Sequence, residues 1–116
     1  SYTSVANGLM ESILERFMEI ARPDGEKSLN FINKLETRAF RSINWLENNL
    51  KNFNDNIFTM DKIAIACALE YTAFRFTDKW QKKNKNLSIW LENFQKNDFM
   101  KLTIPDLTLT PKLKLS

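Results

Sequence analysis

The sequence predicts an all-α fold, a helical bundle of about four to five helices around a central apolar helix at 61–76. Only two glycines and three prolines occur among the 116 residues, which argues against the many tight turns of a sandwich or barrel. Apolar residues recur at helical steps of three and four along the first fifty positions. From Ile63 to Leu69 every residue is apolar, as expected for a helix with neighbours on all sides.

The first helix is expected over Thr3–Ala21. Two adjacent apolar positions recur on each turn, which makes a stripe wide enough to bury two sides of the helix. These positions are Val5, Ala6, Leu9, Met10, Ile13, Leu14, Phe17 and Met18. The helix should end at the sequence ARPDGE, because Pro23 disfavours helix at Arg22 and Gly25 allows a turn.

A second, longer amphipathic helix is expected over Lys27–Leu50. Its apolar stripe comprises Leu29, Ile32, Leu35, Ala39, Ile43, Leu46 and Leu50. Its other face should be solvated and carries Lys34, Glu36, Arg38, Arg41 and Glu47. An asparagine-rich loop at 51–59 follows.

The central helix is expected over Asp61–Phe76. Thr59 is a candidate N-cap, and Asp61 lies in the first turn, where its charge suits the helix dipole. Arg75 closes the helix between two phenylalanines. A buried arginine needs partners, so we interpret Arg75 as a structural anchor on helix C-terminal carbonyls or a carboxylate, in preference to a ligand contact.

The remainder of the chain predicts a polar linker at 77–86, a fourth helix at 87–96 and a tail. The tail, after Phe99, contains two prolines and alternates polar with apolar residues. We therefore expect a helical domain at 1–105 and an extended or flexible segment at 106–116.

Composition excludes several classes of function. There is no histidine, which excludes histidine-based triads and most zinc sites. The single cysteine, Cys67, permits no internal disulfide and suits the cytoplasm. The longest apolar run has seven residues, far short of the ~20 of a membrane helix. A net charge of +3 gives only a weak indication of nucleic-acid binding.

Three further groups invite a functional interpretation, and for each we favour a structural one. Cys67 is expected to be a small core residue because no cation or histidine adjoins it. The paired carboxylates Glu11 and Glu15 lie on the polar side of the first helix and are expected to be surface charges. A basic run with Trp80 among its lysines resembles a nucleic-acid patch, but a solvated linker with one anchoring tryptophan explains it better; its lysines are Lys79, Lys82, Lys83 and Lys85.

The order of short motifs resembles the C-terminal helical domain of bacterial-type cytosolic glutathione S-transferases. VANGLMES resembles that family's ADGLMDA, and RAFRSINWLENNL resembles its helix ending in ALDWLE. FTMDKIAIACALEYTAFRF resembles LTLADIALGCALGYLDFR, the family's central helix with its capping turn. Three further segments resemble the family's arginine-proline turn, its linker with the last core helix, and its closing tail. They are IARPDGE, TDKWQKKNKNLSIWLENF and LTIP. Together the motifs cover nearly the whole chain.

The sequence departs from the family pattern at three places. The family has an acid three residues after the capping Ser/Thr, which completes a reciprocal capping box, whereas this chain has Lys62. On that pattern Lys62→Asp should stabilise the domain by about 1 kcal/mol. Asn7 stands where the family often has aspartate, and NDF at 97–99 replaces RPSF.

The resemblance implies a function that this chain shares with other parts of a larger protein. Family members begin with a thioredoxin-like domain that binds glutathione and activates its thiol. The 116 residues of this sequence do not include such a domain. The helical domain would contribute part of the pocket for a small electrophilic substrate, at Asn7, Met10, Glu11 and Leu14, and part of a homodimer interface. The resemblance implies no metal and no cofactor bound by this chain alone.

Two rival functions remain open at this stage. Transferase-like helical domains also serve as non-enzymatic docking scaffolds, and the absence of a thioredoxin-like stretch from the parent protein would favour that role. A basic nucleic-acid-binding helical domain is the weaker alternative, and strongly salt-dependent binding would support it. The isolated chain is expected to be inactive as an enzyme and to associate through exposed apolar residues of its first helix.

Overall fold

The computed structural model describes residues 1–96, which form an all-α fold with no strand among them. Its elements are α1 (Tyr2–Ile20), the 3-10 turn η1 (Asp24–Glu26), α2 (Leu29–Asn48), the 3-10 turn η2 (Leu50–Asn52), α3 (Met60–Arg75), α4 (Trp80–Lys83) and α5 (Lys85–Gln95). The predicted fold class is confirmed. The expectations for the tail, including a boundary at 105 and the segment 106–116, lie outside the described residues.

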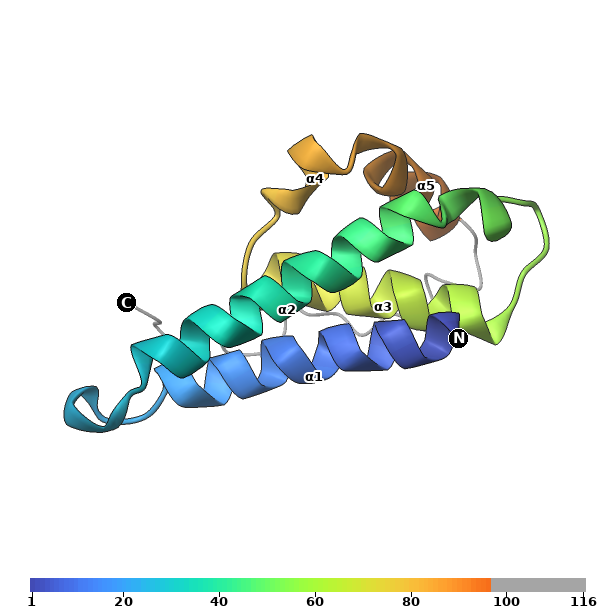
Figure 1. Cartoon of the computed structure of the whole chain (residues 1–116). Helices are drawn as coiled ribbons and strands as arrows, with labels where there is room; N and C mark the ends of the chain where they lie inside the picture. Colours follow the sequence, from blue (N-terminus) through green and yellow to red (C-terminus); the bar gives the residue numbers. More distant parts are fainter. Residues whose placement is uncertain (97–116) are drawn as a thin grey trace.

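Three long helices form the body of the molecule. α1 and α2 lie side by side as an antiparallel pair, and α1 also packs along α3. The short helix α4 and the last helix α5 lie across one end of this layer, where α5 contacts both α2 and α3 (Figure 1). Because α1 touches both other long helices, its position decides which side chains the bundle leaves open.

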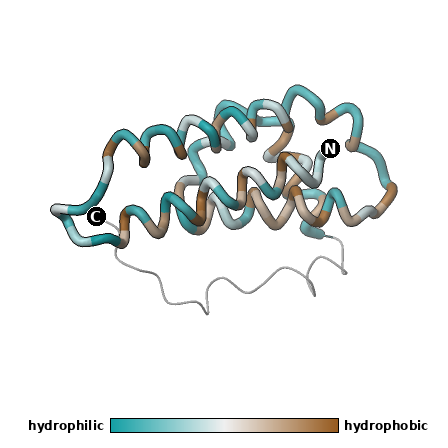
Figure 2. The backbone as a smooth tube through the Cα atoms, turned by 60° about the horizontal axis from the view of Figure 1, so that its bottom comes forward, coloured by the Kyte–Doolittle hydropathy of each residue, from teal (hydrophilic) through white to brown (hydrophobic). Residues whose placement is uncertain are grey.

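The core lies where α1, α2 and α3 meet and continues under α4 and α5. Figure 2 shows brown, apolar positions recurring along the helices, while the connection between α1 and α2 is mostly hydrophilic. The largest side chains that are almost fully buried are Leu9, Ile13, Leu35, Ile43, Leu46, Ile65, Leu69, Trp80 and Leu87. Each long helix therefore contributes buried apolar residues to this core, although one residue of the stripe expected in α2 lies outside it.

The exception is Leu29, which was expected in the stripe and is 73% exposed. Ser28 is the N-cap of α2, and its side chain accepts a hydrogen bond of 3.2 Å from the backbone N–H of Phe31. Leu29 is thus the first helical residue, at the extreme end of the bundle. The buried stripe begins one turn later, at Ile32.

The polar segment at 77–86 contains a helix that the sequence does not predict. Trp80 begins α4 and is only 1% exposed, so burial of its indole holds this turn against the bundle. α5 starts at Lys85, two residues earlier than expected. Its third residue, Leu87, donates its backbone N–H to a carboxylate oxygen of Glu47 at 2.9 Å. Glu47 therefore caps α5 from α2, and the prediction that it is simply solvated is wrong.

α3 is also less enclosed than its composition suggests. One side is buried against the core, including Ile65, Ala66 and Leu69. The opposite side, with Ala64, Cys67 and Glu70, is only half-buried by the described residues. The helix is central to the bundle without being covered on every side by the residues described.

Candidate functional site

The four residues that the family resemblance singled out lie together on the open side of α1. Asn7, Met10, Glu11 and Leu14 line a shallow hollow of about 250 Å³. Asn7 and Glu11 are exposed, Met10 is half-buried and Leu14 is 45% exposed. The hollow thus has two apolar walls and a polar rim, a combination suited to an apolar molecule with one polar group.

The wide stripe of α1 explains why this hollow is open. Ala6, Leu9 and Ile13 face α2 and α3 and are at most 2% exposed. The second half of the stripe turns away from these helices, which leaves Leu14 and, at 54% exposed, Met18 on the surface. We expected two sides of α1 to be buried, but the described residues bury only one of them. An exposed apolar row of this kind marks a surface that another domain or another subunit can cover.

The start of α3 is held by a cap and a buried cation. The backbone N–H of Lys62 donates to Thr59 Oγ1 at 3.3 Å, so Thr59 is the N-cap. The Lys62 side chain is 3% exposed, and its ammonium donates to the Asp55 carboxylate and to the Ile57 carbonyl. It also lies 3.4 Å from the Asp55 carbonyl oxygen. The lysine that replaces the family's acid therefore fastens the preceding loop to the helix.

This arrangement argues against the expectation that Lys62→Asp stabilises the domain. An aspartate there would lose the contacts to Asp55 and Ile57 and would bring a second carboxylate toward the first. Burial makes such a charge costly unless a partner compensates it. The capping turn is therefore not defective, because the loop at 55–57 supplies the oxygen ligands that the lysine needs.

Asp61 lies in the first turn of α3, as expected, and also has a partner on another helix. Its carboxylate accepts a hydrogen bond from the hydroxyl of Thr3. This bond joins the first turns of α1 and α3, which lie side by side (Figure 1). Thr3 gave no signal in the sequence, because a threonine near a chain end is ordinary until its partner is known.

Arg75, at the other end of α3, is anchored by aromatic rings. Its guanidinium carbon lies 4.4 Å from the ring centroid of Phe17 and 4.7 Å from that of Phe74. Its Nε is buried and has no hydrogen-bond partner, and no carboxylate pairs with it among the described residues. Arg75 is an anchor, but cation–π stacking replaces the carbonyl or carboxylate contact that we expected.

Cys67 is not an activated nucleophile. Burial raises the pKa of its thiol, and the nearby charge of Glu70 raises it further. Burial also raises the pKa of the Glu70 carboxyl. The thiol is therefore held in its neutral, less reactive form, although it is half-buried rather than part of the fully buried core.

The remaining groups that the sequence singled out are not brought together into a site. The indole of Trp80 is buried, so it offers no face on which a base could stack beside the surrounding lysines. In the described part of the chain no cluster of metal-ligating side chains occurs. No helix in that part is long and apolar enough to cross a membrane.

The comparison with solved structures places this bundle among known folds. The chain superposes on a glutathione transferase family member from Pseudomonas fluorescens Pf-5, with S-(propanoic acid)-glutathione bound. The TM-score is 0.82 and the sequence identity is 24%. The chain shares the fold of a glutathione transferase. The match covers 90% of this chain and 54% of that one, so our chain spans about half the length of the structure that it resembles. No protein-family model matches the sequence, and no curated protein matches it.

Proposed function

We propose that this chain is the helical domain of a glutathione transferase, contributing part of the hydrophobic-substrate pocket and part of a homodimer interface. The observation that carries the proposal is the superposition of nine-tenths of the chain on a structure with a bound glutathione conjugate. The hollow of Asn7, Met10, Glu11 and Leu14 supports it, because these are the positions that the motif resemblance assigns to the substrate cleft.

The reaction of the parent protein is attack by the glutathione thiolate on an electrophile. The thiolate is the nucleophile, so catalysis requires a group that lowers the thiol pKa. We assign that group, and the glutathione site, to a thioredoxin-like domain of the parent protein. Met10 and Leu14 would contact the apolar part of the electrophile, while Asn7 and Glu11 would contact its polar groups.

The test is a kinetic comparison in the full-length protein, read from the open reading frame upstream of Ser1. Conjugation of glutathione to chlorodinitrobenzene is measured for Leu14→Ala and Met10→Ala. We expect the KM for the electrophile to rise several-fold, while the KM for glutathione stays unchanged, since only uniform binding of the electrophile is weakened. Leu29→Ala, the same change at an exposed site that does not line the hollow, is the matched control and should leave both constants unchanged.

Two outcomes would count against this assignment. A robust conjugating activity of the isolated chain would show that the thiol-activating group lies within it. A parent protein without any thioredoxin-like segment would instead favour a non-enzymatic docking scaffold.

The cytoplasmic location that we propose, on the strength of one unpaired cysteine, would be tested by fractionation of cells expressing the parent protein.

The proposed dimer can be tested separately. The exposed apolar row of α1, with Leu14 at 45% and Met18 at 54% exposed, would be covered by the second subunit or by the partner domain. We expect Met18→Glu to shift the full-length protein from dimer toward monomer in light scattering. An unchanged dimer would place the interface elsewhere.

A further inference from the structure

A row of three cations between two aromatic residues runs along the solvent side of α2. Phe31, Lys34, Arg38, Arg41 and Trp45 follow one another at steps of three, four, three and four, which places them on one side of the helix. All five are exposed. We call this set the basic–aromatic stripe. It extends over fourteen residue-to-residue steps, or about 21 Å of helix.

The cations of the stripe are free of internal partners. Within residues 1–96 the ion pairs involve Arg16, Arg22, Lys27 and Lys62, and none involves Lys34, Arg38 or Arg41. The other charged residues of α2 are already engaged elsewhere. Glu36 pairs with Arg16 at 2.8 Å, and Glu47 accepts from Leu87. The stripe therefore offers its charge outward.

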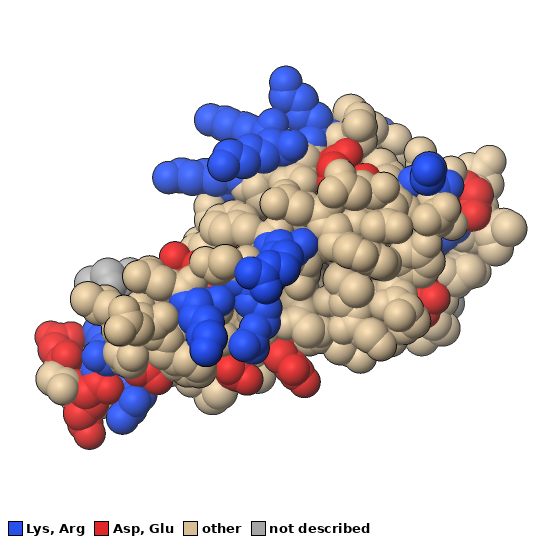
Figure 3. Space-filling view, in the orientation of Figure 1, with Lys and Arg blue, Asp and Glu red and all other residues tan. Residues whose placement is uncertain are grey.

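A second group of cations lies on the same face of the molecule. Figure 3 shows the lysines around α4 and the cations of α2 on one side, while acidic residues gather at the end near η1 and along the lower edge. The α4 group, which we call the lysine corner, consists of Lys79, Lys82, Lys83 and Lys85. Both groups of cations thus lie on the face that Figure 3 shows, although the net charge of the chain is only +3.

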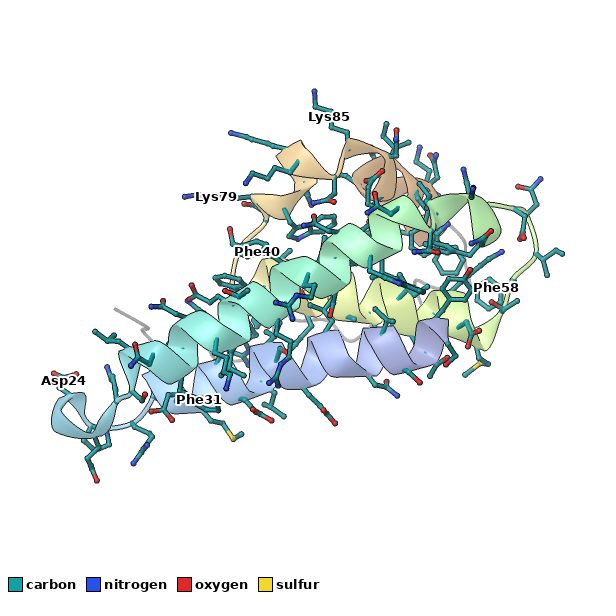
Figure 4. All side chains as sticks on the ribbon, in the orientation of Figure 1. Asp24, Phe31, Phe40, Phe58, Lys79 and Lys85 are labelled. Atoms are coloured by element: carbon teal, nitrogen blue, oxygen red, sulfur yellow. The ribbon has the colours of Figure 1, made fainter. Side chains whose placement is uncertain are left out.

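The two aromatic residues distinguish the stripe from the lysine corner. Phe31 is 38% and Trp45 40% exposed, and Tyr2 supports Trp45 with 5.6 Å between ring centroids. Each ring therefore presents part of its surface to solvent, at either end of the three cations; Phe31 is labelled in Figure 4. Trp80 of the lysine corner is buried and can present none.

We propose that the basic–aromatic stripe binds single-stranded nucleic acid. Lys34, Arg38 and Arg41 contact successive phosphates, and Phe31 and Trp45 stack on bases. Cations that follow a backbone combined with aromatic side chains that stack on bases are the general features of such sites. An acidic protein segment would use the cations but would gain little from the rings. The sequence placed its only nucleic-acid candidate around Trp80, and the structure moves it to α2.

The test uses fluorescence anisotropy with labelled single-stranded RNA and DNA of mixed sequence, each about 16 nucleotides long, the upper end of typical sites. The chain should bind both, with the logarithm of affinity falling linearly against the logarithm of salt. Replacing Lys34, Arg38 and Arg41 together by Gln should reduce the magnitude of that slope by about 2, three phosphate contacts at about 0.7 each. A preference for RNA over DNA would indicate contacts to the ribose hydroxyl.

The matched control removes the same charge from the lysine corner. The triple variant with Lys79, Lys82 and Lys83 changed to Gln should bind at least about tenfold more tightly than the stripe variant at the same salt concentration. Phe31→Leu with Trp45→Leu should weaken binding at least about fivefold, the lower limit for loss of one stacked base, without changing the salt slope. Circular dichroism spectra and melting curves should confirm that each variant folds.

Several results would overturn the proposal. Equal losses in the stripe and corner variants would show a diffuse attraction without a site. An unchanged affinity in the aromatic variant would show that bases do not stack on Phe31 and Trp45. Tighter binding to phosphatidylserine vesicles than to either oligonucleotide would assign the face to a membrane surface, and absence of binding at low salt would exclude nucleic acid altogether.

Discussion

The two ends of α3 are held by opposite kinds of contact. The start is held by directional hydrogen bonds. Thr59 caps the helix, and Asp61 accepts a hydrogen bond from Thr3. The Lys62 ammonium donates to Asp55 and Ile57 of the preceding loop. At the end, Arg75 rests on the rings of Phe17 and Phe74, and its Nε is left without a hydrogen-bond partner. The same helix is thus fixed in position by hydrogen bonds at one end and by stacking at the other.

The difference shows where this helix is sensitive to substitution. A hydrogen-bonded, buried cation tolerates few replacements, since losing it leaves polar oxygens without a partner. A stacked guanidinium makes less directional contacts, and other long side chains can reproduce part of its packing. We therefore expect the start of α3 to respond strongly to mutation and the end to respond weakly.

Lys62→Asp should have the largest effect. We expect a loss of at least about 2 kcal/mol of unfolding free energy, because a carboxylate without a cation would occupy a buried site. Urea denaturation measures the change, and Lys51→Asp, the same substitution at an exposed position of η2, is the control. Stabilisation of the protein would restore the capping-box expectation and contradict the role of the lysine as a tether.

Thr59→Ala should have a smaller effect, a loss of about 1 kcal/mol, as is typical for removal of an N-cap. The backbone N–H of Lys62 would lose its side-chain acceptor, while the lysine tether would remain. The midpoint of urea unfolding gives the value, with Thr37→Ala on the exposed side of α2 as the matched change. If both variants unfold at the wild-type midpoint, the cap makes no measurable contribution.

Arg75→Met should cost less than about 1 kcal/mol, the usual size of a cation–π contact near a surface. Methionine keeps most of the packing on Phe17 and removes the buried Nε that has no hydrogen-bond partner. Thermal unfolding, compared with that of Arg41→Met on exposed α2, measures the difference. A loss as large as that of Lys62→Asp would mean that the two ends of α3 are equally sensitive.

The smallest effects should appear in the pH dependence of stability. The hydrogen bond from Lys62 holds the pKa of the Asp55 carboxyl below its ordinary 3.8. The folded state therefore releases this proton more readily, so the resulting stability is present above pH 3.8 and is lost as pH falls through the lowered pKa. Asp55→Asn should remove that acid-side decline in urea titrations at several pH values.

Glu70 should act in the opposite direction. Burial raises the pKa of its carboxyl above the ordinary 4.5, so the folded state holds the proton more tightly. Stability should then fall as pH rises from 4.5 through the raised pKa, and Glu70→Gln should abolish that fall. If Glu70→Gln instead steepens the fall, the carboxylate is stabilised rather than desolvated in the folded chain.

Helix periodicity and turn residues were enough to predict the fold. The bounds of α1 and α3 fall close to those expected, because apolar spacing and the Thr59 cap are local signals. Glu47, Lys62 and Arg75 were misjudged because their partners come from elsewhere: α5, the preceding loop and α1. The position of the hollow on α1 followed from the family resemblance. The exposed half of the stripe, in contrast, could be separated from its buried half only once α2 and α3 were in place.

The burial of Lys62 also makes it a natural reporter of local opening. Lys62 is the one buried lysine among the described residues, and the next least exposed, Lys27, has 19% of its side chain exposed. Reagents that acylate free amines should modify the surface lysines first and reach Lys62 only when the loop at 55–57 detaches. The rate at which that one peptide gains mass would then measure how often α3 releases its preceding loop, with no mutation introduced.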